Sequence, residues 1–187
     1  MDHYIEIRVL PDPEFPEPVL MNALFAKLHR ALCDAGRGEI GLSFPGLQEQ
    51  RHTLGAVLRL HGAAPALARL MALDWLKGLR DYTQVSPVTP VPAGATHCSL
   101  LRKQFKSSPE RLLRRSIKRG RMTPEQAREK LEQSEARLGQ GPFLRITSRS
   151  TAQQFRLYVQ RGPSQPQPVA GVFNDYGLSK QATVPWF

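Results

Sequence analysis

No long hydrophobic run occurs in this sequence. None of its apolar stretches approaches the roughly 18 to 20 residues that a helix needs to span a bilayer. The first residues, Met1 to Tyr4, also lack the basic stretch and apolar run of a secretory signal. Cysteine is scarce, because Cys33 and Cys98 are the only two and lie far apart in the chain. We therefore expect a cytoplasmic protein whose cysteines stay reduced.

Patterns of metal ligands are lacking as well. No acidic cluster would hold magnesium, and the histidines show no metal-ligand spacing. The histidines are His3, His29, His52, His61 and His97. We therefore expect neither a metal nor another cofactor, and any reaction that this protein catalyses should be metal-independent.

Acidic residues are nearly absent from one short segment. Between Arg102 and Arg121, nine Lys or Arg residues stand beside a single acid, Glu110. This segment carries a net charge of +8, out of +10 for all 187 residues. Such concentrated charge indicates a polyanionic partner, and nucleic acid is favoured over an anionic membrane.

The basic segment is predicted to form a helix that starts at Ser108 and Pro109, because serine caps helices and proline is tolerated in their first turn. Apolar residues such as Ile117 would pack on the protein. A solvated charged face is the alternative, but like charges four residues apart destabilise a helix by a few tenths of a kcal/mol per pair. We therefore favour an anionic partner. The cations within an arc of about 160° are Arg111, Arg114, Arg115, Lys118, Arg119 and Arg121.

The first half of the chain predicts a β-α-β-β-α-β order of elements. This order is the ferredoxin-like pattern, which many RNA-binding modules share and which is specific to none. Alternating apolar residues indicate the strands, and apolar residues three and four apart indicate the helices. The predicted elements are a strand at Ile5–Val9, a helix from Glu17, strands at Ile40–Phe44 and Ala56–His61, a helix at Pro65–Leu79 and a strand at Tyr82–Val88.

The second half is predicted to be a smaller α+β domain that carries the arginine-rich helix. Prolines 87, 90 and 92 and Gly94 interrupt any regular pattern, so we place the domain boundary there and assign residues 1–94 and 95–187 to two domains. Thr123 and Gln126 have the spacing of a capping box and predict a helix that runs to about Leu138. Two strands are expected at Phe143–Thr147 and Gln154–Gln160.

Several side chains could carry chemistry, and each also has an ordinary structural interpretation. His29 lies at helical spacing from Phe25 and Cys33, and by itself it is more simply explained as a histidine on the flank of a helix. Arg102 and Gln104 would share one face of an extended segment, where they could read guanine and adenine, or they could belong to a surface loop. The remaining alternatives are a turn for Ser148 and Ser150, core packing for Phe155 and a surface turn for Tyr176.

Taken together, these residues resemble the CRISPR repeat-RNA processing endoribonucleases of subtype I-F, the Csy-type members of the Cas6 superfamily. The likeness covers essentially the whole chain, and the order and spacing of its pieces are specific. The pieces are Asp2-His3-Tyr4 with Pro11-Asp12-Pro13-Glu14-Phe15, Lys27-Leu28-His29, Arg102-Lys103-Gln104 leading into Ser108-Pro109-Glu110-Arg111-Leu112, Ser148 with Ser150-Thr151, Phe155-Arg156-Leu157, Tyr176-Gly177-Leu178-Ser179-Lys180 and Val184-Pro185-Trp186-Phe187.

The resemblance implies a ferredoxin-like first domain and a second domain that inserts the basic helix into the groove of an RNA hairpin. It implies that the hairpin belongs to a CRISPR precursor transcript and is cut at the 3′ base of its stem. The expected products are a 2′,3′-cyclic phosphate and a 5′-hydroxyl. The enzyme would stay on the mature crRNA and join the crRNA-guided surveillance complex of type I-F.

The resemblance also assigns roles to individual residues. His29 matches the catalytic histidine, Ser148 the residue that holds the reacting ribose, and Tyr176 the residue that orients the histidine. Whether His29 acts first as a base or as an acid stays open. The expected RNA-binding residues are Arg102 and Gln104 as base readers, Phe155 as the aromatic that stacks on the terminal base pair, and Ser150, Arg111, Arg114, Arg115, Lys118 and Arg119.

Two other functions are compatible with the charge pattern. A non-catalytic protein that binds hairpin RNA would use the same basic helix and would differ only at His29, Ser148 and Tyr176. A DNA-binding regulator would need a dimer and a recognition helix that reads base edges in the major groove. The sequence offers little support for the regulator.

Overall fold

A computed structural model describes residues 1–35, 37–103, 115–130, 141–147 and 153–187 of the chain. Some of the sequence-based predictions therefore lie outside the described residues. They include the start of the basic helix at Ser108 and the end of the following helix near Leu138. The candidate site residues outside the described ranges are Gln104, Arg111, Arg114, Ser148 and Ser150.

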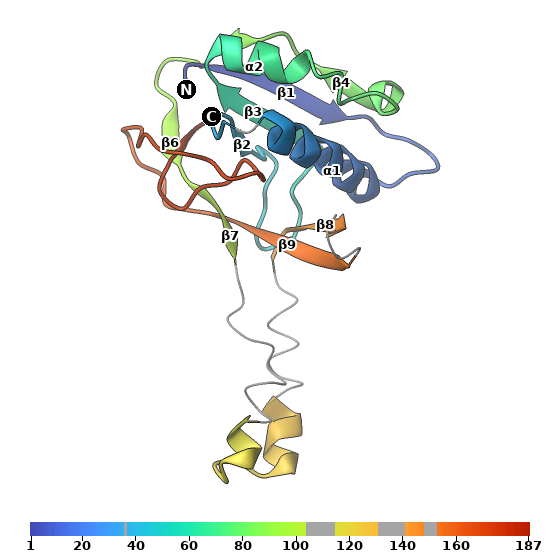
Figure 1. The fold of residues 1–187 in the computed structure, drawn as a ribbon, viewed down its shortest axis with the longest axis vertical. Helices are drawn as coiled ribbons and strands as arrows, with labels where there is room; N and C mark the ends of the chain where they lie inside the picture. Colours follow the sequence, from blue (N-terminus) through green and yellow to red (C-terminus); the bar gives the residue numbers. More distant parts are fainter. Residues whose placement is uncertain (36, 104–114, 131–140, 148–152) are drawn as a thin grey trace.

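The first part of the chain forms an antiparallel sheet in the order β2-β3-β1-β4, with β5 also pairing with β1. Helices α1 and α2 contact each other and β1, and α2 also contacts β3 (Figure 1). Apolar residues of β1, such as Ile5 and Ile7, are buried together with Leu24 and Leu28 of α1. The elements are β1 (His3–Val9), α1 (Glu17–Ala35), β2 (Gly41–Ser43), β3 (Val57–Gly62), α2 (Ala64–Met71), η1 (Arg80–Tyr82), β4 (Thr83–Val85) and β5 (Thr89–Pro90).

Two predicted boundaries in this part are wrong. The helix expected to reach Leu79 ends at Met71. Turns follow it, with positive φ angles at Asp74 (48°) and Gly78 (80°). Apolar residues in these turns are still buried. The pattern of apolar residues therefore continues past the end of the helix, which is why the predicted helix was too long. The last strand is also shorter than predicted, because Tyr82 lies in the 3₁₀ turn η1 and the paired residues of β4 end at Val85, shortly before Pro87.

The second part forms the sheet β7-β9-β8 and the pair β10-β6, all antiparallel. The two strands predicted near Phe143 and Gln154 are confirmed as β8 and β9. The strands β6, β7 and β10 were not predicted, since they are short and each pairs with a partner far away in sequence. Their bounds are β6 (Thr96–Cys98), β7 (Leu100–Lys103), β8 (Phe143–Thr147), β9 (Gln154–Arg161) and β10 (Val184–Trp186).

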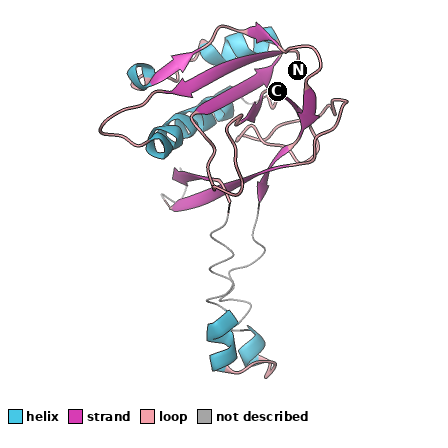
Figure 2. Ribbon diagram, turned by 180° about the vertical axis from the view of Figure 1, so that it is seen from behind, coloured by secondary structure: helices cyan, strands magenta, loops and turns pink. Residues whose placement is uncertain are grey.

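Helix α1 lies between the first sheet and the β7-β9-β8 sheet, as both views show (Figures 1 and 2). Leu144 and Ile146 of β8 and Leu157 of β9 belong to the same buried cluster as the apolar face of α1. The Arg145 backbone N–H donates to Asn22 Oδ1 of α1 at 2.9 Å, which ties helix and strand together. The overall class is therefore α+β with antiparallel sheets, and α1 is placed to carry His29 close to residues of the second part.

Residues 115–118 and 124–130 are helical, and a sharp stop separates them. Gly120 has a φ of +64°, and the N–H groups of Gly120 and Arg121 donate to the carbonyls of Ile117 (2.9 Å) and Ser116 (3.0 Å). This pattern is a Schellman stop, which glycine favours because it has no Cβ.

The predicted capping box is confirmed, because Thr123 Oγ1 accepts from Gln126 N (3.3 Å) and Gln126 Oε1 accepts from Thr123 N (3.1 Å). No helix in the described ranges is long and apolar enough to cross a membrane.

His61, in the first sheet, should make the free energy of unfolding depend on pH. Burial lowers the pKa of His61 from 6.5 to about 3, and the charge of Arg59 acts in the same direction. The ring shares a 2.8 Å hydrogen bond with Ser43 Oγ inside the core. Above its ordinary pKa the histidine is neutral in both the folded and the unfolded state. As the pH falls from 6.5 toward 3, only the unfolded chain takes up this proton, so the free energy of unfolding decreases.

We expect His61→Gln to make the acid loss of stability shallower than in the wild type. One proton accounts for a slope of at most about 1.4 kcal/mol per pH unit. Urea unfolding at several pH values, from near neutral to mildly acidic, measures the slope for each protein. The exposed His52, changed to asparagine, is the control and should keep the wild-type slope. Equal slopes for the wild type and His61→Gln would contradict the expectation.

Candidate active site

His29 lies on α1 directly after the fully buried Leu28, and its ring is half-buried. Its Nδ1 is 2.7 Å from the backbone carbonyl oxygen of Asp175, which comes from the opposite end of the chain. A carbonyl oxygen can only accept a hydrogen bond, so Nδ1 carries a proton and donates it. In the neutral ring, Nε2 then keeps its lone pair and can accept a proton from another group.

Tyr176 stacks on the imidazole of His29. The two ring centroids are 4.4 Å apart, and the ring planes are inclined by 16°. The tyrosine ring is also nearly parallel to buried Phe25, one helical turn before His29, with centroids 6.5 Å apart. One turn after His29, the sulfur of Cys33 lies 3.7 Å from Nδ1 and 4.0 Å from Nε2. The helical spacing of Phe25, His29 and Cys33 seen in the sequence is therefore confirmed, and stacking limits how the imidazole can tilt.

The turn that carries Asp175 and Tyr176 is anchored to two strands. Leu42 N–H of β2 donates to the Gly177 carbonyl at 3.1 Å, and Ser179 N–H donates to the Leu100 carbonyl of β7 at 2.9 Å. Gly177 has a φ of +67°, and a Cβ at this position would come within 2.7 Å of the Leu42 side chain. The predicted turn around Tyr176 is confirmed, and both its backbone angle and the close packing require glycine.

Arg102 and Phe155 form a second part of the candidate site, on adjacent strands. The Arg102 guanidinium carbon lies 5.4 Å from the centroid of the Phe155 ring. Arg102 belongs to β7 and is therefore extended, which was one of the two alternatives that the sequence left open. Phe155 is half-buried, so one part of its side chain packs against the core and the rest is exposed to solvent. Ser148 and Ser150, which follow β8 in the chain, lie outside the described residues.

The described cations from Arg115 to Arg121 are exposed. Arg115, Lys118, Arg119 and Arg121 all present their side chains to solvent. Ile117, which was expected to pack on the protein, is instead 37% exposed. For Ile117 that expectation is wrong, because the helical turn that carries it lies apart from the sheets in Figure 1.

Phe155→Ala separates the two functions of this ring. If the ring stacks on a base, the substitution should weaken binding of a hairpin RNA by roughly 1 to 3 kcal/mol. Because the ring is only half-buried, the loss of folding stability should stay below the roughly 3 to 5 kcal/mol of a fully buried phenylalanine. Binding titrations and thermal melts on the same protein measure the two effects.

Phe143→Ala is a matched control for this experiment, because Phe143 is a half-buried phenylalanine on the neighbouring strand whose ring packs beside Tyr158. It should lower the melting temperature without weakening RNA binding. A large drop in melting temperature for Phe155→Ala with unchanged affinity would show that this ring is purely a packing residue.

Sequence reasoning missed the backbone partner of His29. Asp175 contributes a main-chain oxygen, and main-chain groups leave no signal in residue identity. Asn174, which shapes the same turn, was also missed, although an asparagine three residues before a glycine is a local sign of a turn. Among the residues that the structure describes, no group of three or more histidine, cysteine or acidic side chains could hold a metal ion.

The fold and the site define an α+β protein with a half-buried histidine, held by a backbone carbonyl and a stacked tyrosine, and a strongly basic segment. The family model described as CRISPR-associated protein (Cas_Csy4) matches residues 4–187. The chain belongs to this family. It is 53% identical, over all 187 residues of both chains, to the "CRISPR-associated endonuclease Cas6/Csy4" of Escherichia coli (strain UTI89 / UPEC). It is 46% identical, again over the full length of both, to the protein of the same name from Pseudomonas aeruginosa (strain UCBPP-PA14).

Proposed function

We propose that this protein is a metal-independent endoribonuclease that binds the hairpin of CRISPR repeat RNA and cuts the precursor at the 3′ base of the stem. The observation that carries the proposal is the 2.7 Å hydrogen bond from His29 Nδ1 to the Asp175 carbonyl, because it leaves Nε2 as a proton acceptor. The relatives named as endonucleases support the same activity.

In the proposed reaction, the 2′-hydroxyl upstream of the scissile phosphate attacks phosphorus, and the bond to the 5′-oxygen of the next nucleotide breaks. The products are a 2′,3′-cyclic phosphate and a 5′-hydroxyl. We assign the proton exchange to His29 Nε2, which can take the proton of the 2′-hydroxyl or, once protonated, give one to the leaving oxygen. Tyr176 would hold the imidazole in place by stacking, and Ser148 would hold the reacting ribose.

RNA binding is assigned to the basic segment and to the strand β7 next to it. Exposed arginines can make charge-assisted, bidentate hydrogen bonds to phosphates along the groove of the hairpin. Arg102 and Gln104 would read bases of the lower stem, and Phe155 would stack on the terminal base pair. The phosphate and backbone contacts would come from Arg111, Arg114, Arg115, Lys118, Arg119 and Ser150.

We further propose that residues 1–94 are a ferredoxin-like domain and residues 95–187 an RNA-binding domain. The antiparallel strand order β2-β3-β1-β4 with both helices of this part in contact supports the first assignment. The protein would keep the mature crRNA after the cut and join the other subunits of a type I-F surveillance complex.

The proposal is tested by incubating the purified protein with a subtype I-F repeat RNA in the presence of EDTA. We expect one cut at the 3′ base of the stem, and end analysis of the fragments should find the cyclic phosphate and the 5′-hydroxyl. Tight binding without any cut would identify a non-catalytic hairpin-binding protein instead. Cutting that stops in EDTA would contradict the metal-independent reaction.

A further inference from the structure

We propose that Asn174 is a positioning residue for His29: its side-chain oxygen shapes the turn that supplies the Asp175 carbonyl and the Tyr176 ring, which both contact the histidine. This inference rests on the proposed function, in which His29 moves the proton. The Asn174 side-chain oxygen bonds backbone N–H groups of the turn and not the imidazole, so its effect is carried by the two residues that follow it.

The Asn174 side chain closes the turn from within. Its Oδ1 accepts hydrogen bonds from the N–H groups of Tyr176 (2.9 Å) and Leu178 (3.1 Å). Both partners are backbone donors, so only the oxygen end of the amide can face them. The backbone of Asn174 completes the closure, because its N–H donates to the Leu178 carbonyl (3.0 Å) and its carbonyl accepts from Gly177 N–H (2.7 Å).

Asp175 and Tyr176 are the two residues enclosed by these bonds. The direction of the Asp175 carbonyl and the position of the Tyr176 backbone are therefore set by the turn. That carbonyl determines which nitrogen of His29 carries the proton, and the tyrosine ring determines how the imidazole lies. A single side-chain oxygen thus acts on both the protonation pattern and the orientation of the histidine.

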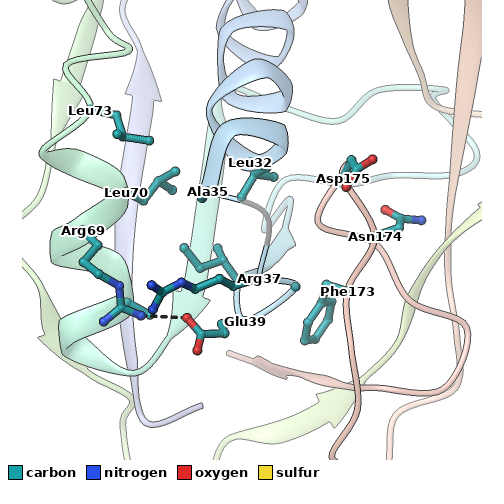
Figure 3. A pocket seen from close by; sticks show the side chains of 13 residues that line it. Leu32, Ala35, Arg37, Glu39, Arg69, Leu70, Leu73, Phe173, Asn174 and Asp175 are labelled. Carbon is teal, nitrogen blue, oxygen red and sulfur yellow. Dashed lines mark hydrogen bonds and ion pairs between the residues drawn. The ribbon is translucent and has the colours of Figure 1, made fainter.

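Packing on the outer side of the turn cannot replace these bonds. Asn174 and Asp175 are exposed, and both line a cavity of about 200 Å³ whose other walls include the end of α1, residues 37–40 and α2. Figure 3 shows the two residues at the edge of this space, across from Leu32 and Leu70. The backbone beyond the turn is anchored through Leu42 and Leu100, so loss of Oδ1 should loosen residues 175 and 176 while the fold persists.

The test compares variants that keep or lose the acceptor. Asn174→Ala should lower the single-turnover cleavage rate of the repeat hairpin by roughly tenfold, because small misplacements of a reacting group cost this much or more. Hairpin affinity should be unchanged. Asn174→Asp keeps an oxygen at the same place and should retain most of the rate. In the free protein, ¹⁵N NMR of the His29 ring should show one tautomer, with Nδ1 protonated, in the wild type and a mixture in Asn174→Ala.

Asp12→Ala is the matched control. Asp12 Oδ1 accepts from two backbone N–H groups, of Glu14 (2.9 Å) and Phe15 (2.8 Å), in a turn that does not carry a partner of His29. This variant should lose the same kind of bonds and keep the cleavage rate. If Asn174→Ala does not fold at the assay temperature, Asn174→Leu, which has a similar shape and no acceptor, takes its place.

A wild-type rate or an unchanged ring signature in the folded variant without the acceptor would overturn the role of Asn174. Failure of the proposed function has a different result: the wild-type protein would not cut, or His29→Ala would cut normally. In that case the NMR comparison still decides whether Asn174 positions the ring.

Discussion

His29→Ala is expected to reduce single-turnover cleavage of the repeat hairpin by about 10²- to 10⁴-fold, the usual contribution of one general acid–base group. Hairpin affinity should be largely intact. The exposed arginines of the basic segment lie in the second half of the chain, whereas His29 lies on α1 and hydrogen-bonds through Nδ1 to the Asp175 carbonyl. Loss of the imidazole therefore removes the proton acceptor and leaves the charged surface in place.

The measurement is a single-turnover time course in EDTA, next to a binding titration with the same RNA. His52→Asn is the matched histidine control and should cut at the wild-type rate, since this side chain is exposed and is not one of the described partners of His29, which are Asp175 and Tyr176 with Cys33 nearby. A substrate with a 2′-deoxyribose just upstream of the scissile phosphate should bind but stay uncut, because the nucleophile is missing. Normal cutting of that substrate would rule out attack by the 2′-hydroxyl, and normal cutting by His29→Ala would move catalysis to another residue.

The double variant Arg115→Ala/Arg119→Ala is expected to bind the hairpin much more weakly and with a shallower dependence on salt. Each neutralised phosphate contributes about 0.7 to 0.9 to the steepness of log K against log salt. Two lost contacts should therefore reduce the steepness by roughly 1.4 to 1.8. Both side chains are exposed and one helical turn apart, so they can reach phosphates of the same strand or groove.

Binding titrations at several salt concentrations give the slope for each protein. Arg8→Ala/Arg37→Ala removes two exposed arginines from the first half of the chain and is the charge-matched control. It should lower the slope far less, because these residues are not part of the basic segment. If Arg115→Ala/Arg119→Ala kept the wild-type slope and affinity, the arginines of this helix would face solvent in the complex.

Elements with strong local signals were predicted well. The apolar face of α1, the alternation in β8 and β9, and the capping box of Thr123 and Gln126 all depend on residues that are neighbours in sequence. The end of α2 and the strands β6, β7 and β10 were not predictable in the same way. Apolar residues continued past Met71 into turns, and the short strands are defined by partners that lie many residues away.

The sequence by itself determined the segregation of charge, the presence of a histidine on one face of a helix, and the family resemblance, because these are properties of residue order alone. The tertiary structure decided what the histidine can do. Its partners, the Asp175 carbonyl and the Tyr176 ring, lie 146 and more residues away, and one of them is a main-chain oxygen that every residue possesses. Only folding brings that oxygen to Nδ1, and this contact, shaped by the turn at Asn174, leaves Nε2 as the proton acceptor.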